Sequence, residues 1–216
     1  MTETETLSRS MHDIGLAAWF GGSLMGAVGV NGAAADVDDP RHRARVANAG
    51  WGRWTPVNLV AIGAHLIGGL QLARRDVSRV DNQSGVAALT LTKTGLTGAA
   101  LLATGYARVL GQKIMSAGDV PVAGGTEPLP QTPPDVAKAQ KQLKLLQWVI
   151  PALTGGILVT NAIAGEQERP EQQAKGFLRG GLSDLSGLSS VTGGNSHPSR
   201  RGVGETMKAV LTGSSK

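Results

Sequence analysis

The chain has 216 residues, no cysteine and a formal net charge of +5 at pH 7. The lack of cysteine excludes disulfides, thiol catalysis and cysteine-bound metals. Its basic residues flank apolar segments instead of forming one patch, which suits anionic lipid headgroups and makes nucleic acid the weaker choice of partner.

Four stretches of the sequence are almost free of charge, at residues 14–34, 54–73, 85–107 and 145–165. A helix needs roughly 20 mostly apolar residues to cross the hydrocarbon core of a bilayer. The sequence therefore predicts an all-α fold, an integral membrane four-helix bundle over residues 1–165. The alternative is a soluble bundle of glycine-rich helices. A soluble helix should carry a charged face, however, and the first and fourth stretches carry none.

Small residues line one face of the first stretch and one face of the third. Helices in lipid associate through close van der Waals packing, which small residues permit. We predict helix packing at these positions, either within one bundle or between copies of the chain. The positions are Gly15, Gly22, Gly26, Gly29, Gly95 and Ala99.

The connections differ in kind. Residues 35–53 are predicted to be a charge-balanced connector that includes a short surface helix. Residues 108–134 are rich in glycine and proline, which favours an extended linker. Asp135 is a predicted helix start, from which the chain continues without a breaker into the fourth stretch. Pro151 is expected to kink that helix or to leave a backbone carbonyl without a partner.

Four crossings would place the amino terminus, the second connection and the tail on one side of the membrane, called side A here, and the other two connections on side B. Trp and Tyr concentrate at bilayer interfaces, and Trp51, Trp54, Tyr106 and Trp148 all fall near side B. We predict that side A is cytoplasmic, because the long tail then needs no export.

The tail, residues 166–216, is rich in glycine, serine, glutamine and charge. It has too little apolar surface to offset the entropy of ordering, so we predict that it is largely disordered. Within it, the apolar residues of 177–188 gather on one helical side and could lie on a membrane surface, although glycines weaken that helix.

Polar residues inside the predicted spans are the candidate functional residues. His65 and Lys93 both lie roughly 12 Å from side A, counted at 1.5 Å per residue, so they could meet. Asn161, His12 and Asp13 would extend this intramembrane polar cluster toward side A. Ionisable groups at such depth mark pathways, relays or ligands. The other interpretation is that Lys93 extends its amine to the interface while His65 simply bonds a neighbouring helix.

No cofactor or metal site is expected from the remaining pattern. A bis-histidine haem needs both rings at one depth, whereas His12 is expected at the interface and His65 far inside. Met25 has no sulfur partner, and no His, Asp or Glu pairs recur at ligand spacing. We also find no nucleophile motif for Ser/His/Asp catalysis and no phosphate loop, so the sequence predicts a protein that is not an enzyme.

The run His12-Asp13-Ile14-Gly15-Leu16-Ala17-Ala18-Trp19-Phe20-Gly21-Gly22 resembles the start of copper-resistance-D-type bacterial membrane proteins and of related uncharacterised four-helix proteins. The likeness covers about a tenth of the chain. It implies a small bacterial four-helix membrane protein, and copper transport through His12 and His65.

Two functions remain open from the sequence. The first is a structural or accessory subunit of the bacterial plasma membrane, with the lipid bilayer and a membrane-protein partner or a second copy of the chain as its contacts. The second is a small transporter or proton-coupled permease that uses His65 and Lys93.

Overall fold

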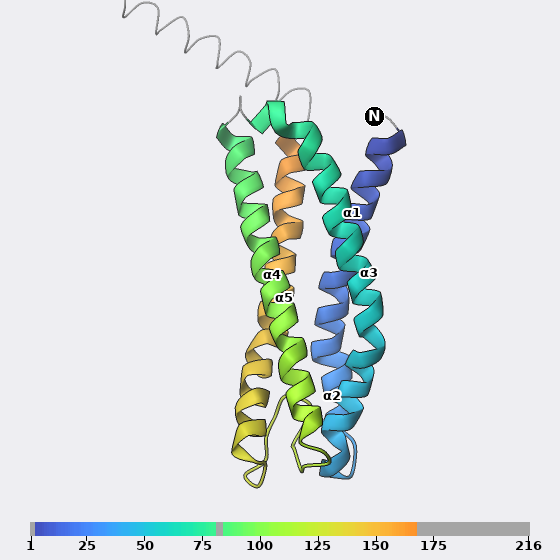
Figure 1. Ribbon diagram of the computed structural model, residues 1–216, viewed down its shortest axis with the longest axis vertical. Helices are drawn as coiled ribbons and strands as arrows, with labels where there is room; N and C mark the ends of the chain where they lie inside the picture. The colour runs from blue at the N-terminus through green and yellow to red at the C-terminus, as the bar shows by residue number, and fades with distance from the viewer. Residues whose placement is uncertain (1–2, 81–83, 168–216) are drawn as a thin grey trace, which may run out of the picture. The chain divides into compact units, whose positions relative to one another are not determined.

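A computed structural model describes residues 3–80 and 84–167 of the chain. Its regular elements are helical: α1 (Glu3–Met25), the π-helical turn η1 (Gly26–Val30), α2 (Asn31–Ala35), α3 (Pro40–Val80), α4 (Ser84–Ser116) and α5 (Pro134–Gln167). Since α1, η1 and α2 follow one another without a break, they form one rod. The described residues thus make four rods that run side by side (Figure 1), and the predicted all-α four-helix fold is confirmed.

The helices extend well beyond the apolar stretches. α3 has 41 residues, which is about 60 Å of helix and roughly twice the thickness of a hydrocarbon core. Proline is tolerated in the first turn of a helix, and Pro40 and Pro134 open α3 and α5. The predicted connector with a separate surface helix is therefore wrong: residues 40–53 belong to α3. The predicted continuous helix from near Asp135 is confirmed.

Three of the described helices are long and apolar enough to cross a membrane, over Glu5–Ala35, Pro40–Arg74 and Pro134–Gly165. α4 is not among these three over its described residues, and it carries Lys93 and several threonines. Two of these hydroxyls bond within the helix: Thr92 donates to the Ala88 carbonyl and Thr94 to the Thr90 carbonyl, both at 2.9 Å. Such bonds inside a helix reduce the penalty for placing a hydroxyl in lipid.

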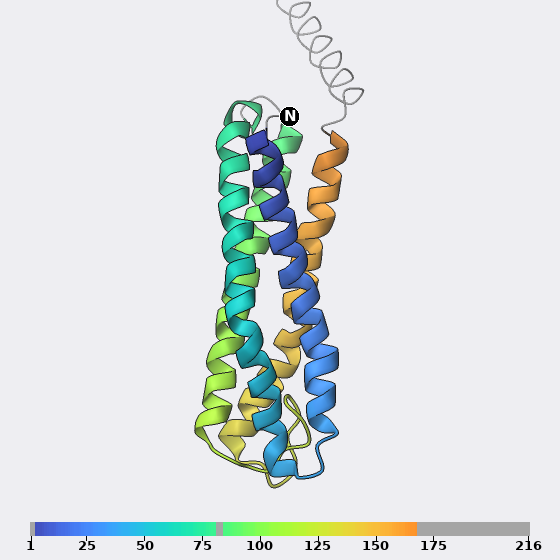
Figure 2. The ribbon, with the colours of Figure 1, turned by 90° about the vertical axis from the view of Figure 1, so that its right-hand side faces the viewer.

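The rods do not pack equally tightly. The closest backbone approach joins α1 and α3, and both views show these two rods side by side (Figures 1 and 2). The backbones of α4 and α5 lie farther away, and these two rods contact the pair through their side chains. The shared core consists of Leu16, Trp19, Ile62, Ala100 and Ile157, which come from all four rods.

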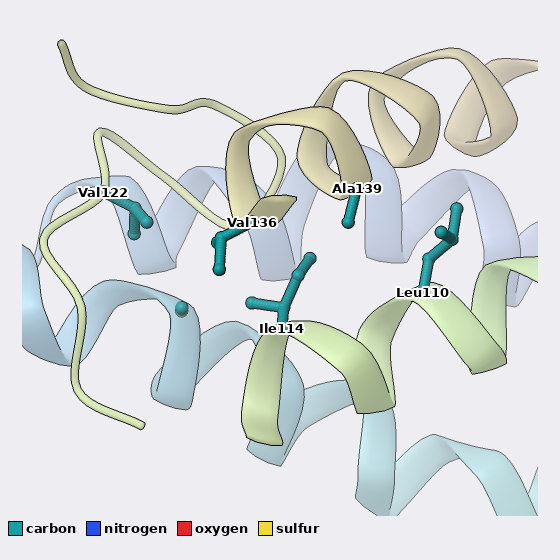
Figure 3. Packing of buried hydrophobic residues seen from close by; sticks show 6 residues of the cluster. Leu110, Ile114, Val122, Val136 and Ala139 are labelled. Carbon is teal, nitrogen blue, oxygen red and sulfur yellow. The ribbon is translucent and has the colours of Figure 1, made fainter. Parts of the chain in front are cut away.

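On side B the segment between α4 and α5 folds back onto the bundle. Val122 is fully buried and belongs to one cluster with Leu110 and Ile114 of α4 and Val136 of α5 (Figure 3). The segment contains no helix, as its prolines predict, but the expected extended linker is wrong. Burial of Val122 against the helix ends removes its apolar surface from water, which stabilises the folded loop. An extended linker would leave that side chain exposed.

Polar bonds hold this folded loop in place. Gln140, which is fully buried, donates from Nε2 to the Gly124 carbonyl at 2.8 Å. Arg43 donates from Nε to the Val37 carbonyl at 2.7 Å and from Nη1 to the Ala123 carbonyl at 3.1 Å. Residues 117–133 are therefore part of the folded unit.

α5 passes through Pro151 as one continuous helix. Proline has no N–H, so the Gln147 carbonyl lacks its usual partner one turn later. The predicted tail beyond residue 167, with its apolar segment at 177–188, lies outside the described residues.

Candidate functional site

The crossing of α1 and α3 brings His12 and His65 together. Their rings are stacked, with centroids 4.1 Å apart and planes inclined by 20°. Nδ1 of His12 lies 3.0 Å from the His65 carbonyl oxygen, and Nδ1 of His65 lies 3.1 Å from the His12 carbonyl oxygen. A carbonyl can only accept, so each Nδ1 carries the proton and donates, and each Nε2 remains for another partner.

Glycines make this approach possible. A Cβ atom at Gly15 would overlap the Ala61 carbonyl and lie 2.6 Å from the His65 amide nitrogen. On the facing helix, a Cβ atom at Gly68 would lie 2.6 Å from the His12 amide nitrogen. Only hydrogen fits at either position, so the two backbones come close enough for each histidine to reach the other's carbonyl.

The remaining members of the predicted polar cluster lie apart from this pair. Asp13 is exposed and Lys93 is half-buried, and both lie within electrostatic range of His65. The carboxamide of Asn161 has both polar atoms buried without a hydrogen-bond partner among the described residues. No hydrogen bond or ion pair of the described residues joins these three side chains to the histidine pair.

The expectation that His12 and His65 lie at different depths is wrong. α1 begins at Glu3, so His12 lies inside the helix and not at its mouth. Stacked rings 4.1 Å apart leave no space for an iron between them, so this arrangement does not fit a bis-histidine haem. The described residues hold no group of three or more His, Cys, Asp or Glu side chains that could bind a metal ion.

A cavity of about 400 Å³ lies inside the bundle toward side B. It is lined by residues of α1, α2, α3, α4, α5 and the folded loop. Aromatic and aliphatic side chains make up much of its wall, including three indoles: Trp19, Trp51 and Trp54. The cavity exists because α4 and α5 stand off from the tightly packed α1–α3 pair.

Amides and hydroxyls supply the polar part of the wall. Asn31 accepts from Nε1 of Trp51 at 3.0 Å and donates to Oε1 of Gln147 at 2.8 Å. Nε1 of Trp19 donates to the Thr104 hydroxyl at 3.2 Å. These three bonds tie α1 and α2 to the other three rods around the cavity.

Two polar atoms of the cavity wall are buried without a partner among the described residues. They are Nε1 of Trp54, a donor, and Oδ1 of Asn58, an acceptor. Trp54 and Asn58 are four residues apart on α3, so their side chains are neighbours on one helical face. An unpaired buried polar group is destabilising by about 1–3 kcal/mol. A bound molecule that forms hydrogen bonds with these two atoms would therefore gain more binding free energy here than elsewhere on the wall.

Sequence reasoning missed the cavity. The sequence predicts that Trp51 and Trp54 are interfacial residues that open the second helix, but α3 begins at Pro40 and both indoles line the cavity. One signal in the sequence is the pair of asparagines and the pair of tryptophans within residues 48–58. Asparagine is unfavourable on a surface that faces lipid, so these residues indicate an inward-facing polar wall. Trp148 and Tyr106, by contrast, are about half exposed.

The predicted packing positions divide into two groups. Gly15, Gly22 and Gly26 face α3: a Cβ atom would overlap the Trp54 ring at Gly22 and the Trp51 ring at Gly26. Gly29, Gly95 and Ala99 are exposed. A Cβ atom at Gly95 would meet no atom within 4 Å. The small face of α1 thus packs within the chain, whereas that of α4 points outward.

Comparison with protein-family models, curated proteins and solved structures finds no match.

Proposed function

We propose that this chain is an integral protein of the bacterial plasma membrane that acts as a structural or accessory subunit, with both termini in the cytoplasm. The distribution of side chains supports this most directly. Val60, Leu91 and Leu102 are 74%, 74% and 78% exposed, whereas His65 is 2% exposed and Thr154 fully buried. Lipid favours this pattern, because apolar side chains face the acyl chains and polar groups find partners inside.

The outward face of α4 supports a role as a subunit. Leu91, Thr92, Gly95 and Ala99 lie along it, and all are exposed. Small residues allow a second helix to approach closely, and the threonine adds hydrogen-bonding capacity. The contact proposed for this face is a helix of a membrane-protein partner or of a second copy of the chain.

Native mass spectrometry after extraction in a mild detergent tests this role. The unaltered protein is expected as a complex or homo-oligomer. Gly95→Phe should reduce the associated fraction at least tenfold, because the ring prevents close approach. Val60→Phe on α3 is the control at another exposed position and should leave association intact. A monomer without any bound protein would contradict the proposal.

A second candidate, a proton-coupled permease, is supported by the stacked histidines. His65 is buried, and its Nε2 is not used by the bond to His12. An imidazole with one nitrogen available can take up and release a proton within a membrane.

Proton entry into vesicles that contain the protein and a pH-sensitive dye tests this candidate. Under an imposed membrane potential, His65→Leu and Lys93→Leu together should abolish proton entry above that of protein-free vesicles. His42→Leu, which changes a partly exposed histidine at the start of α3, is the control and should leave entry unchanged. Equal entry for the double variant and the unaltered protein would eliminate the permease.

A further inference from the structure

The side B cavity has a donor-rich wall without a carboxylate. None of its lining residues is Asp, Glu or His, and its one charged residue, Arg108, is exposed. The donors include Nε1 of Trp54, which is buried without a partner among the described residues, and the amide nitrogen of Asn58, whose Oδ1 is the unpaired buried acceptor. The amide nitrogen of Gln147 adds another, since only Oε1 of Gln147 bonds to Asn31.

Shape and polarity together define what would occupy this space. A volume of about 400 Å³ lies within the range of small-molecule sites. Three indoles and the aliphatic side chains of Ile62 and Leu101 offer flat and apolar contacts. Donors spaced around such walls fit a ring that carries acceptors, because apolar contact orients the ring while each buried donor finds an oxygen.

The loop at 117–133 forms part of the enclosure. Gly125 and Thr126 are buried and line the cavity. Gln140 holds the carbonyls of Gly124 and Gly125 at 2.8 and 3.3 Å. A molecule in the cavity would therefore lie against buried loop residues on side B, where a hydrogen bond is stronger than in water.

We infer that the side B cavity binds an uncharged, lipid-soluble molecule with a flat apolar ring and carbonyl acceptors, the chemistry of a quinone headgroup. Nε1 of Trp54 and the amide nitrogen of Asn58 are the donors to its carbonyls, and the indoles of Trp19 and Trp51 are its apolar contacts. The bilayer supplies such molecules directly. This binding depends on neither the subunit role nor the permease role proposed above.

Calorimetric titration of the full chain in lipid nanodiscs tests the inference, with empty nanodiscs as the reference for partitioning. Menadione, a naphthoquinone with two carbonyls, should bind saturably. 2-Methylnaphthalene, which has the same rings and no acceptor, should bind at least tenfold more weakly. 2-Naphthoate, an anion, should also bind more weakly than menadione.

Two variants locate the site. Trp54→Phe keeps a ring and removes the donor, and Asn58→Leu keeps the volume and removes the carboxamide. Each should weaken menadione binding about tenfold and leave 2-methylnaphthalene binding unchanged. Trp148→Phe changes a tryptophan outside the cavity and should have no effect. Circular dichroism checks that each variant is folded. If the smaller ring at position 54 disturbs packing against Gly22, the Asn58→Leu variant by itself is sufficient for the test.

Menadione that binds no better to filled than to empty nanodiscs would overturn the inference. So would unchanged affinity in a folded Asn58→Leu variant. Tighter binding of 2-naphthoate than of menadione would show that the site recognises an anion near Arg108, and the carbonyl class would then be wrong.

Discussion

The absence of a Cβ atom at Gly15 determines how closely α1 and α3 pack. Gly15 faces the backbone of α3, and nothing larger than hydrogen fits between it and the Ala61 carbonyl. The same close approach aligns the carbonyls of His12 and His65 with the opposite rings. A single small side chain thus controls both helix packing and the geometry of the histidine pair.

Gly15→Ala is therefore expected to destabilise the bundle by about 1–3 kcal/mol, the usual penalty for overpacking a core. Thermal unfolding of the detergent-solubilised protein measures it. Gly21→Ala is the matched control on the same helix, because a Cβ atom at Gly21 would meet no atom within 4 Å. Its effect should be near zero or slightly stabilising, since alanine favours helix. Equal stability of the two variants would contradict the packing account.

Individual polar residues were only partly predictable. His65 and Lys93 were identifiable because charge is rare in an apolar stretch, but their partners were not. His12 pairs with His65 because of the register between α1 and α3, and register follows from which glycines face each other. Trp54 and Asn58 gave no comparable signal, since neither is ionisable.

At the scale of helices and loops, the largest difference between expectation and structure lies on side B. Hydropathy marks only the part of a helix that meets lipid, and the charged residues 40–53 continue the helix without a break. The folded loop was missed because its proline content excludes helix but does not exclude packing. Val122 and its contacts with Ile114 and Val136 decide its position.

The π-helical turn η1 is another such feature. It lies between α1 and α2 and was not predicted. An i→i+5 turn shifts the following residues around the helix axis relative to an α-helix. Beyond it, Asn31 is buried and bonds both Trp51 and Gln147. The turn thereby contributes to the polar wall of the cavity.

For the whole molecule, four antiparallel rods require alternating connections. Reporter fusions after Ala35, Arg79, Gly125 and Lys216 measure this. Fusions after Ala35 and Gly125 should report the outside of the cell, and those after Arg79 and Lys216 the cytoplasm. α4 is the critical case because it is not among the three rods that qualify as membrane spans over their described residues. Arg79 and Gly125 on the same side would show that α4 does not cross.

The sequence by itself determined the number of helices, their apolar centres and the polar residues placed among them, because length and hydropathy are local properties. Only the tertiary structure decided which residues meet. The histidine stack depends on glycines that face each other across two helices, and the cavity depends on how far α4 and α5 stand from α1 and α3. Such distances follow from the packing of all side chains together, which no local pattern records.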